Sequence, residues 1–318
     1  MDNNRASINM HPVLERSSKL ERGSTVKRWI SSQWMQQAFF IGPAILFYSI
    51  VIAIPFFFGI YYSMTSWDGV SGNAVWVGLN NFSTIFLKDP EFGQSFWFTT
   101  RFTLTAVILN NVIGFALAYL LSLPLKSRSA IRTIFFLPNV LGGLVLGFIW
   151  QFILVQGFPG IGKLTNLSFF NLPWLGTEAT AYWALIIVSV WQGAGYLMVI
   201  YIAGLANVPK DLIEASVIDG AGKWQILKNI IIPLIMPTVT VCLFISISWT
   251  FKMFDLNYSL TSGGPYGSTE SVAMNIYNEA FGNNRYGLGT AKALIFFVAV
   301  TFITLIQVKL TKSREVEM

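Results

Sequence analysis

Side chains that could do covalent or metal chemistry are scarce in this chain of 318 residues. It has one histidine, His11, and one cysteine, Cys242. A nucleophile needs a base beside it and a metal site needs several ligands, so two isolated side chains build neither. A single cysteine also forms no disulfide within the chain. Cys242 lies in a long apolar stretch, where we interpret it as a small apolar side chain.

One segment approaches the spacing of a phosphate-binding loop. Gly157, Gly162 and Lys163 have the spacing of that motif, but Leu164 stands where the motif needs a Ser or Thr hydroxyl for magnesium. The segment also follows an apolar stretch rather than a strand. We therefore predict that the chain is not an enzyme, hydrolyses no ATP, and binds neither a cofactor nor a metal.

Polar and aromatic side chains within two apolar stretches could bind a ligand rich in hydroxyl groups. Sugars are held by hydrogen-bonding side chains together with aromatic faces. The candidate substrate path consists of Trp191, Gln192, Tyr196, Ser246, Trp249, Thr250 and Met253. For each of them, tying helices together is the alternative. Asn110 and Asn111 are interpreted as interhelical hydrogen-bonding residues, while Lys252 and Asp255 either pair with each other or form an outer gate.

Residues 207–233 combine two short helical patterns with a glycine break. Acidic residues occupy the opening turns of the first pattern, where the helix dipole favours them. Gly220 supplies the turn, and Pro233 and Pro237 mark the bend back towards the apolar stretches. Three acids balance three bases in this segment, whereas a loop lying on lipid carries an excess of Lys and Arg. The pattern therefore predicts a surface that docks another protein.

The elements that must position these residues are long apolar helices. The chain is 54% hydrophobic and 11% charged, against roughly 25% charged residues in a soluble protein. Six stretches of at least 22 residues carry no charge, apart from Lys292 in the last: 38–63, 102–125, 134–155, 179–208, 229–251 and 286–308. Each is long enough to cross about 30 Å of hydrocarbon as a helix. The sequence thus predicts an all-α membrane protein with six transmembrane helices.

Proline and glycine within these stretches predict local features. Pro43, Pro55 and Pro138 predict kinks or entry turns. Gly143 and Gly147 have the spacing that lets two helices approach closely, which we interpret as packing.

The positive charges predict how the chain is oriented. Fifteen of the 21 Lys and Arg residues lie in the N-terminal segment, the loops near 126–132 and 210–228, and the tail. The positive-inside rule then places both termini in the cytoplasm. We expect a cytoplasmic N-terminal segment at 1–36, a transmembrane domain at 37–310 and a cytoplasmic tail at 311–318. The net charge of +6 is thus an orientation signal, and no nucleic-acid partner is expected.

The loop at 207–233 resembles the EAA signature of permease subunits of binding-protein-dependent ABC importers. The matching positions are Glu214, Ala215, Ser216, Asp219, Gly220, Ala221, Ile230, Pro233 and Pro237. The chain departs from the signature at Ser216, in place of Ala, and at Ile232, in place of Leu. Further segments are similar to the carbohydrate branch of that family, namely 77–82, 191–192, 203–205 and 260–265.

This resemblance implies a six-helix permease of the type I ABC importer fold, in the cytoplasmic (inner) membrane of a prokaryote. It implies a second homologous permease subunit as a heterodimeric partner, two cytoplasmic ATPase subunits that hold ATP and magnesium, and an extracellular or periplasmic solute-binding protein. The substrate is expected to be a sugar or oligosaccharide. The ATPase-coupling residues carried over are Leu212, Glu214, Ala215, Ser216, Ile218, Asp219, Gly220 and Ala221, with Glu214 as a charge partner and Gly220 as the hinge.

Other functions stay open on the sequence alone. An importer of a polyol or of glycerol phosphate shares the same signatures. An ion-coupled secondary carrier would normally place a carboxylate or a histidine near the membrane midplane and show internal repeats. A membrane-embedded assembly protein without transport activity is a third class.

Overall fold

The computed structural model describes residues 37, 39–124 and 126–313. Most of the N-terminal segment and the last five residues of the tail lie outside the described residues, so what the sequence predicts for them stays a prediction. The described ranges are helical and contain no strand, only an isolated bridge between Thr65 and Trp76. The chain divides into two compact units, Met1–Gly59 and Ile60–Met318, and each is described by itself.

The first unit holds most of one apolar helical span, Phe39–Ser63. This span includes the π-helical turn η1 (Ser49–Ala53) and α2 (Ile54–Ser63), and its last residues belong to the second unit. Nothing in its most apolar window is buried. A helix therefore covers 39–63 of the stretch predicted at 38–63, and its length and apolar character suit a membrane span.

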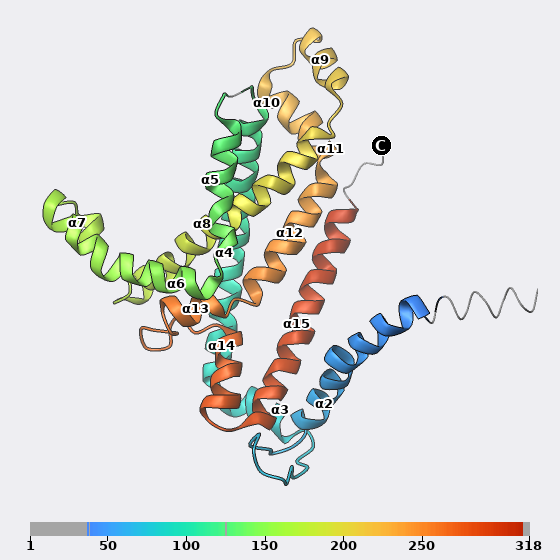
Figure 1. The fold of residues 1–318 in the computed structure, drawn as a ribbon, viewed down its shortest axis with the longest axis vertical. Coiled ribbons are helices and arrows are strands. Elements are labelled where there is room, and N and C mark those ends of the chain that lie inside the picture. The colour runs from blue at the N-terminus through green and yellow to red at the C-terminus, as the bar shows by residue number, and fades with distance from the viewer. Residues whose placement is uncertain (1–36, 38, 125, 314–318) are drawn as a thin grey trace, which may run out of the picture. The chain divides into compact units, whose positions relative to one another are not determined.

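Two long helices form the centre of the second unit. They are α4 (Pro90–Ser122) and α8 (Glu178–Ala206), which pack along each other (Figure 1). Phe102 and Leu185 are fully buried in the core cluster that these helices share. The first helix begins well before its apolar stretch, because Asp89 accepts a hydrogen bond from the backbone N–H of Phe92 and Pro90 occupies the first position.

The apolar stretch 134–155 is not one straight helix, and this corrects the sequence prediction. It is divided between α5 (Arg128–Val140) and α6 (Gly143–Phe152). Pro138 supplies no N–H to the helical ladder, and Leu141 and Gly142 then adopt extended backbone angles. The span in this region is Gly143–Thr165, which continues through η2 (Ile153–Gly157) and α7 (Phe158–Thr165). Residues 157–163, the near-match to a phosphate loop, are thus helical.

Gly143 and Gly147 allow α6 to approach the short helix α13 (Asp255–Leu260). A Cβ atom on Gly147 would overlap the hydroxyl of Ser259, and one on Gly143 would lie 3.1 Å from the Cβ of Asp255. The interpretation of this glycine pair as a packing feature is confirmed.

The C-terminal half of the second unit begins with a hairpin and a bent helix. In chain order its elements are α9 (Lys210–Ile218), α10 (Lys223–Ile226), η4 (Leu227–Ile231), α11 (Ile232–Leu234) and α12 (Met236–Phe251). The segments Lys223–Leu234 and Met236–Phe251 meet at 71°. The bend lies at Ile235, between the two predicted prolines, Pro233 and Pro237.

Four short elements and one long helix complete this unit. They are α3 (Asn80–Lys88), η3 (Ser168–Asn171), α14 (Val272–Tyr277), η5 (Asn278–Gly282) and the long α15 (Tyr286–Lys312). In the described part of the chain, five helices are long and apolar enough to cross a membrane, or six if the bent pair is one span.

Candidate functional site

The predicted docking loop folds as a helical hairpin at one end of the second unit (Figure 1). The helix α9 ends in a Schellman motif, because the N–H of Ala221 donates to the carbonyl of Ser216 and the N–H of Gly220 donates to that of Val217. Gly220 has a φ of 81°, the left-handed conformation that this motif requires. The glycine of the signature therefore stops the helix and turns the chain into α10.

The hairpin exposes most of the predicted coupling residues. Glu214, Ala215, Asp219 and Gly220 are exposed, as are Leu212 and Ile218. Ser216 is buried instead, and its hydroxyl donates to the carbonyl of Ile213 at 2.7 Å. Ala221 is half-buried against the core below the hairpin. The structure thus brings six of the eight predicted residues to the surface and places the other two on the inner side.

Two exposed apolar residues of the hairpin were missed by the sequence reasoning. Val217 is 59% exposed and Trp224, on α10, is 72% exposed, beside Ile218 at 86%. Large apolar side chains at this exposure are typical of a surface that another protein covers. The signal was available, since Trp224 is a tryptophan in a polar connection between apolar stretches.

The inner side of the hairpin is fastened to the long helices. Ile213 and Ala221 pack against a cluster that includes Tyr201 of α8, Ile226 of α10 and Cys242 of α12. Cys242 is fully buried there, as expected for an apolar filler. The hairpin therefore shares one packed core with α8 and α12.

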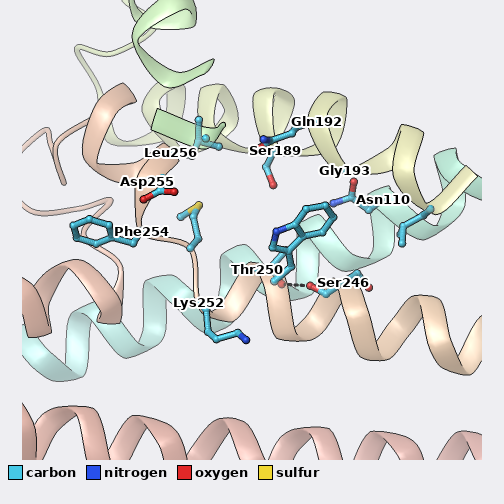
Figure 2. A pocket seen from close by; sticks show the side chains of 14 residues that line it. Asn110, Ser189, Gln192, Gly193, Ser246, Thr250, Lys252, Phe254, Asp255 and Leu256 are labelled. Carbon is cyan, nitrogen blue, oxygen red and sulfur yellow. Dashed lines mark hydrogen bonds between the residues drawn. The ribbon is translucent and has the colours of Figure 1, made fainter. Parts of the chain in front are cut away.

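A pocket of about 200 Å³ lies between α8 and α12, with contributions from α4, the start of α6 and the junction of α12 and α13 (Figure 2). Five of the seven predicted substrate-path residues line it: Gln192, Ser246, Trp249, Thr250 and Met253. Trp191 and Tyr196 do not. Trp191 contacts the ring of Trp150, and Tyr196 contacts that of Trp249, each at 5.5 Å between ring centroids.

Hydrogen bonds within the protein use part of the polar lining. Gln192 donates from Nε2 to the carbonyl of Leu141 at 3.1 Å, which is the carbonyl at the break between α5 and α6. Ser246 and Thr250 each donate to a backbone carbonyl of their own helix. Gln192 and Trp249 line the pocket together with Ser189.

The two asparagines of α4 have different surroundings. Asn111 donates to the hydroxyl of Ser246 on α12 at 3.0 Å and accepts from the hydroxyl of Tyr201 on α8 at 2.8 Å. Its predicted role between helices is confirmed. Asn110 instead lines the pocket, and its buried Oδ1 has no hydrogen-bond partner among the described residues. A buried amide oxygen without a partner is a site for a ligand hydroxyl or a water molecule.

Lys252 and Asp255 both line the pocket, and no ion pair joins them within the described ranges. The sequence left open whether these two residues pair with each other or form an outer gate, and the structure shows no direct ion pair between them. Figure 2 shows Asp255 at the α13 side of the pocket and the Lys252 ammonium directed away from it. The pocket lining therefore contains one acidic and one basic side chain together with amide, hydroxyl and aromatic groups.

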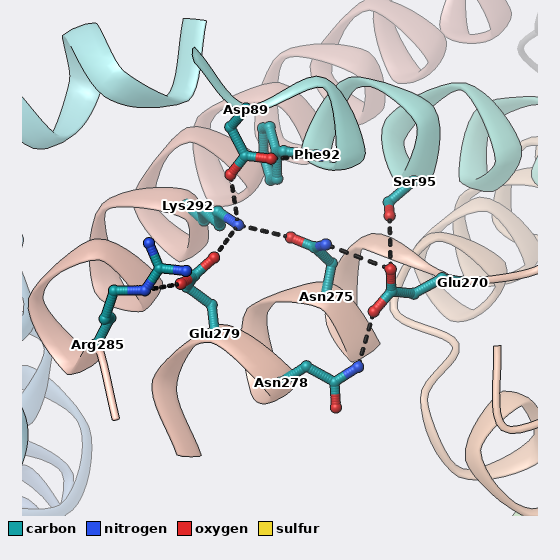
Figure 3. A network of polar contacts seen from close by, with 9 residues as sticks. All are labelled: Asp89, Phe92, Ser95, Glu270, Asn275, Asn278, Glu279, Arg285 and Lys292. Carbon is teal, nitrogen blue, oxygen red and sulfur yellow. Dashed lines mark hydrogen bonds and ion pairs between the residues drawn. The ribbon is translucent and has the colours of Figure 1, made fainter. Parts of the chain in front are cut away.

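A second polar centre lies where α15 meets α4, α14 and η5 (Figure 3). Lys292, the charge in the last apolar stretch, is 1% exposed. Its Nζ lies 2.7 Å from Oδ2 of Asp89 and 2.6 Å from Oε2 of Glu279, and it donates to Oδ1 of Asn275 at 2.9 Å. Arg285 pairs with the other oxygen of Glu279 at 2.8 Å.

The pKa of Asp89 reflects this arrangement. Burial alone would raise it, but the hydrogen bond and charge of Lys292 and the N–H of Phe92 stabilise the carboxylate and bring the pKa below its ordinary value. Beside this centre, Glu270 accepts hydrogen bonds from Ser95 and from Asn278 (Figure 3). The buried ammonium of Lys292 is thus matched by two carboxylates and an amide oxygen.

Known proteins resemble this chain over most of its length. Residues 110–315 match the family described as binding-protein-dependent transport system inner membrane component. The probable starch degradation products transport system permease protein AmyD of Thermoanaerobacterium thermosulfurigenes is 47% identical over 88% of this chain and 94% of its own length. The multiple sugar-binding transport system permease protein MsmF of Streptococcus mutans is 32% identical over 92% of this chain and all of its own length.

A solved structure shows the same fold. A chain of a bacterial ABC transporter involved in the import of the acidic polysaccharide alginate aligns with a TM-score of 0.77, covering 91% of this chain and 99% of its own, at 20% sequence identity. The helical fold, the bent span and the loop signature agree with the family match, which confirms the resemblance read from residues 214–237. The chain therefore belongs to the family of inner membrane components of binding-protein-dependent transport systems.

Proposed function

We propose that this chain is a non-catalytic permease subunit of an ATP-driven importer of sugars or oligosaccharides. One observation carries the proposal: the same two helices hold both the pocket and the hairpin. The pocket is lined by Gln192 on α8 and by Ser246 on α12. The first helix ends at Ala206, just before the hairpin, and the second begins at Met236, after the hairpin and the short segments η4 and α11. Work done on the hairpin can thus change the pocket.

The substrate class rests on the lining and on the relatives. Amide, hydroxyl and indole groups around the pocket suit the hydroxyl groups and apolar faces of a sugar. The relatives' names refer to starch degradation products and to multiple sugars. A binding assay of the cognate solute-binding protein with neutral sugars, polyols and glycerol phosphate separates the proposed substrate from the alternatives of the same branch.

The assembly follows from the same proposal. A second permease subunit forms the other half of the path, two cytoplasmic ATPase subunits receive the hairpins, and an external solute-binding protein delivers the substrate. ATP and magnesium are held by the ATPase subunits. Residues 1–36 and 311–318 and the hairpin then lie in the cytoplasm, around a membrane domain at 37–310. Family membership supports this assembly over an ion-coupled carrier that works alone.

The ATPase-coupling role rests on the exposed face of α9. Glu214 is exposed one helical turn before Ile218, which is exposed as well. An apolar surface around one carboxylate fits an apolar groove that ends in a basic side chain. Removing one member of such a covered charge pair leaves the other charge buried without a partner, which is costly. Asp211 is an exposed acid on the same helix and belongs to its first turn. It therefore provides a matched control.

The test uses the assembled importer in proteoliposomes. Replacing Glu214 by Ala should lower substrate-stimulated ATP hydrolysis and uptake by about tenfold or more, since a hot-spot charge is worth roughly 2 kcal/mol or more. The Asp211→Ala control should stay within about twofold. Equal activity of Glu214→Ala and wild-type importers would refute the coupling role, while absence of any sugar-stimulated turnover in the wild type would refute the proposed function.

A further inference from the structure

A continuous row of aromatic rings leads away from the pocket. We call it the aromatic track, and its members are Phe254, Tyr258, Tyr277, Phe281, Tyr286 and Trp67. Successive ring centroids are 5.1 to 6.2 Å apart. The rings come from four separate segments of the chain, so no single helical repeat produces the row.

The track begins at the pocket and ends at the far side of the molecule from the hairpin. Phe254 lines the pocket at the end opposite Asn110 (Figure 2). Tyr277 closes α14, and Tyr286 opens α15 next to the loop that carries Trp67. In Figure 1 these elements lie successively further from α9. The track thus joins the pocket to the end at which a substrate would arrive.

The middle of the track is open, unlike a structural aromatic cluster. Tyr258, Tyr277 and Phe281 are 40%, 41% and 62% exposed. By contrast, the neighbouring rings of Phe98 and Phe102 in the core are 4% and 0% exposed. Rings that serve packing are buried, because burial is what makes them stabilising.

The tyrosines of the track also offer free polar groups. The hydroxyls of Tyr258 and Tyr277 form no hydrogen bond within the described ranges, whereas that of buried Tyr182 bonds to Thr105. Exposed rings with free hydroxyls provide apolar faces and hydrogen-bonding edges together. A sugar unit has the same combination, with apolar faces and hydroxyl groups around the rim.

We propose that the aromatic track binds the trailing units of an oligosaccharide whose leading unit occupies the pocket. This inference rests on the proposed function and adds to it a second binding region that selects for chain length. In this proposal, a disaccharide is held at the pocket alone and does not need the track. A longer glucan extends beyond Phe254 and lies on Tyr277 and Phe281.

The experiment compares uptake of maltose and maltopentaose by the assembled importer in proteoliposomes, loaded with its own solute-binding protein. Tyr277→Ala and Phe281→Ala remove rings from the open part of the track. Phe86→Ala removes a ring that is 73% exposed, on α3 and outside the track, and serves as the matched control. We expect the ratio of maltopentaose to maltose uptake to fall about three- to tenfold in the track variants. The control should keep the wild-type ratio.

The outcomes separate the possible roles of these rings. An unchanged ratio in Tyr277→Ala and Phe281→Ala overturns the inference, and so does an equal loss for both sugars, which indicates a lipid or subunit contact instead. Tyr277→Phe keeps the ring and should retain most of the ratio, which checks that stacking matters. ATP hydrolysis without sugar shows that each variant is assembled. If the wild-type importer transports neither sugar, the proposed substrate class fails rather than the track.

Discussion

At the scale of single residues, Gly220 determines where the coupling helix stops. Its φ of 81° is accessible to glycine at little cost, and a Cβ atom there would meet nothing within 4 Å. The requirement for glycine is therefore conformational rather than steric. The sequence reasoning assigned this residue as a hinge, whereas the geometry describes it as the left-handed closing residue of a Schellman motif.

Replacing Gly220 by Ala should loosen the end of α9. An alanine in the left-handed region costs about 1 to 2 kcal/mol, so amide exchange at the end of the helix should accelerate by roughly fivefold or more. Gly222→Ala is the matched control, since Gly222 lies two residues away with φ −72°, and a Cβ atom there would make only an ordinary contact, 3.6 Å from Oε1 of Gln225. Hydrogen exchange with mass spectrometry on both variants tests this. Matching exchange rates in the two proteins would contradict it.

The side of α9 that faces inward could not be read from its sequence. Leu212, Ile213, Val217 and Ile218 surround the helix almost completely with apolar side chains. The charged residues of α9 are interspersed among these apolar side chains, so the sequence pattern does not indicate which side of the helix faces the core. Only the packed structure shows that Ile213 and Ser216 face the core, which leaves Ile218 for a partner.

At the scale of elements, the charged network around Lys292 holds three segments together. Asp89 begins α4, Glu279 lies in η5 and Lys292 lies in α15, so one ammonium ties all three. Sequence analysis recorded Lys292 only as the one charge in an apolar stretch. Its partner Asp89 lies far away in the sequence, and its partner Glu279 lies in a connecting segment. No helical periodicity in the sequence relates either residue to Lys292.

Replacing Lys292 by Met should destabilise the protein by about 3 to 5 kcal/mol, because Asp89 and Glu279 would be left without their buried cation. Arg285→Gln is the control: it removes the other cation on Glu279, but Arg285 is 59% exposed, and exposed pairs contribute about 1 kcal/mol or less. Unfolding of both variants in the same detergent measures the difference. Similar losses in the two would show that burial does not govern this network.

The break between α5 and α6 shows where local sequence signals stop being decisive. Pro55 and Pro138 both lie in apolar stretches, yet α2 continues beyond Pro55 while α5 ends shortly after Pro138. The difference lies in the surroundings, since Gln192 of α8 donates to the freed carbonyl of Leu141. A residue from a distant helix thus stabilises the break, and the local sequence does not contain that information.

At the scale of the whole molecule, the apolar stretches were predictable and their internal arrangement was not. Five of the six predicted stretches correspond to candidate spans if the bent pair is counted as one. They were predictable because the length of an apolar stretch and its lack of charge decide whether it inserts into a membrane. Which side of each helix lines the pocket depends on packing between distant helices. Trp191 and Gln192 are adjacent in α8, yet only Gln192 lines the pocket.

The proposed orientation predicts which side of the membrane each loop faces. A cysteine at Ser71, exposed in the loop after α2, should react with a membrane-impermeant maleimide in intact cells. A cysteine at Ser129, exposed near the start of α5 and outside the coupling surface, should react only after the cells are permeabilised. The wild type provides the background, because its Cys242 is fully buried. Labelling of Ser129→Cys from outside would contradict the proposed orientation.

The hydrogen bonds of Asn111 have a mechanical consequence. They fasten α4 to Tyr201 of α8 and to Ser246 of α12, on the hairpin side of the pocket. Sliding one of these helices past the others would break both bonds, whereas tilting around Asn111 preserves them. Under the proposed function, Asn111 is the pivot about which the three helices tilt. A push at the hairpin would then reach the pocket as a rotation rather than as a sliding movement.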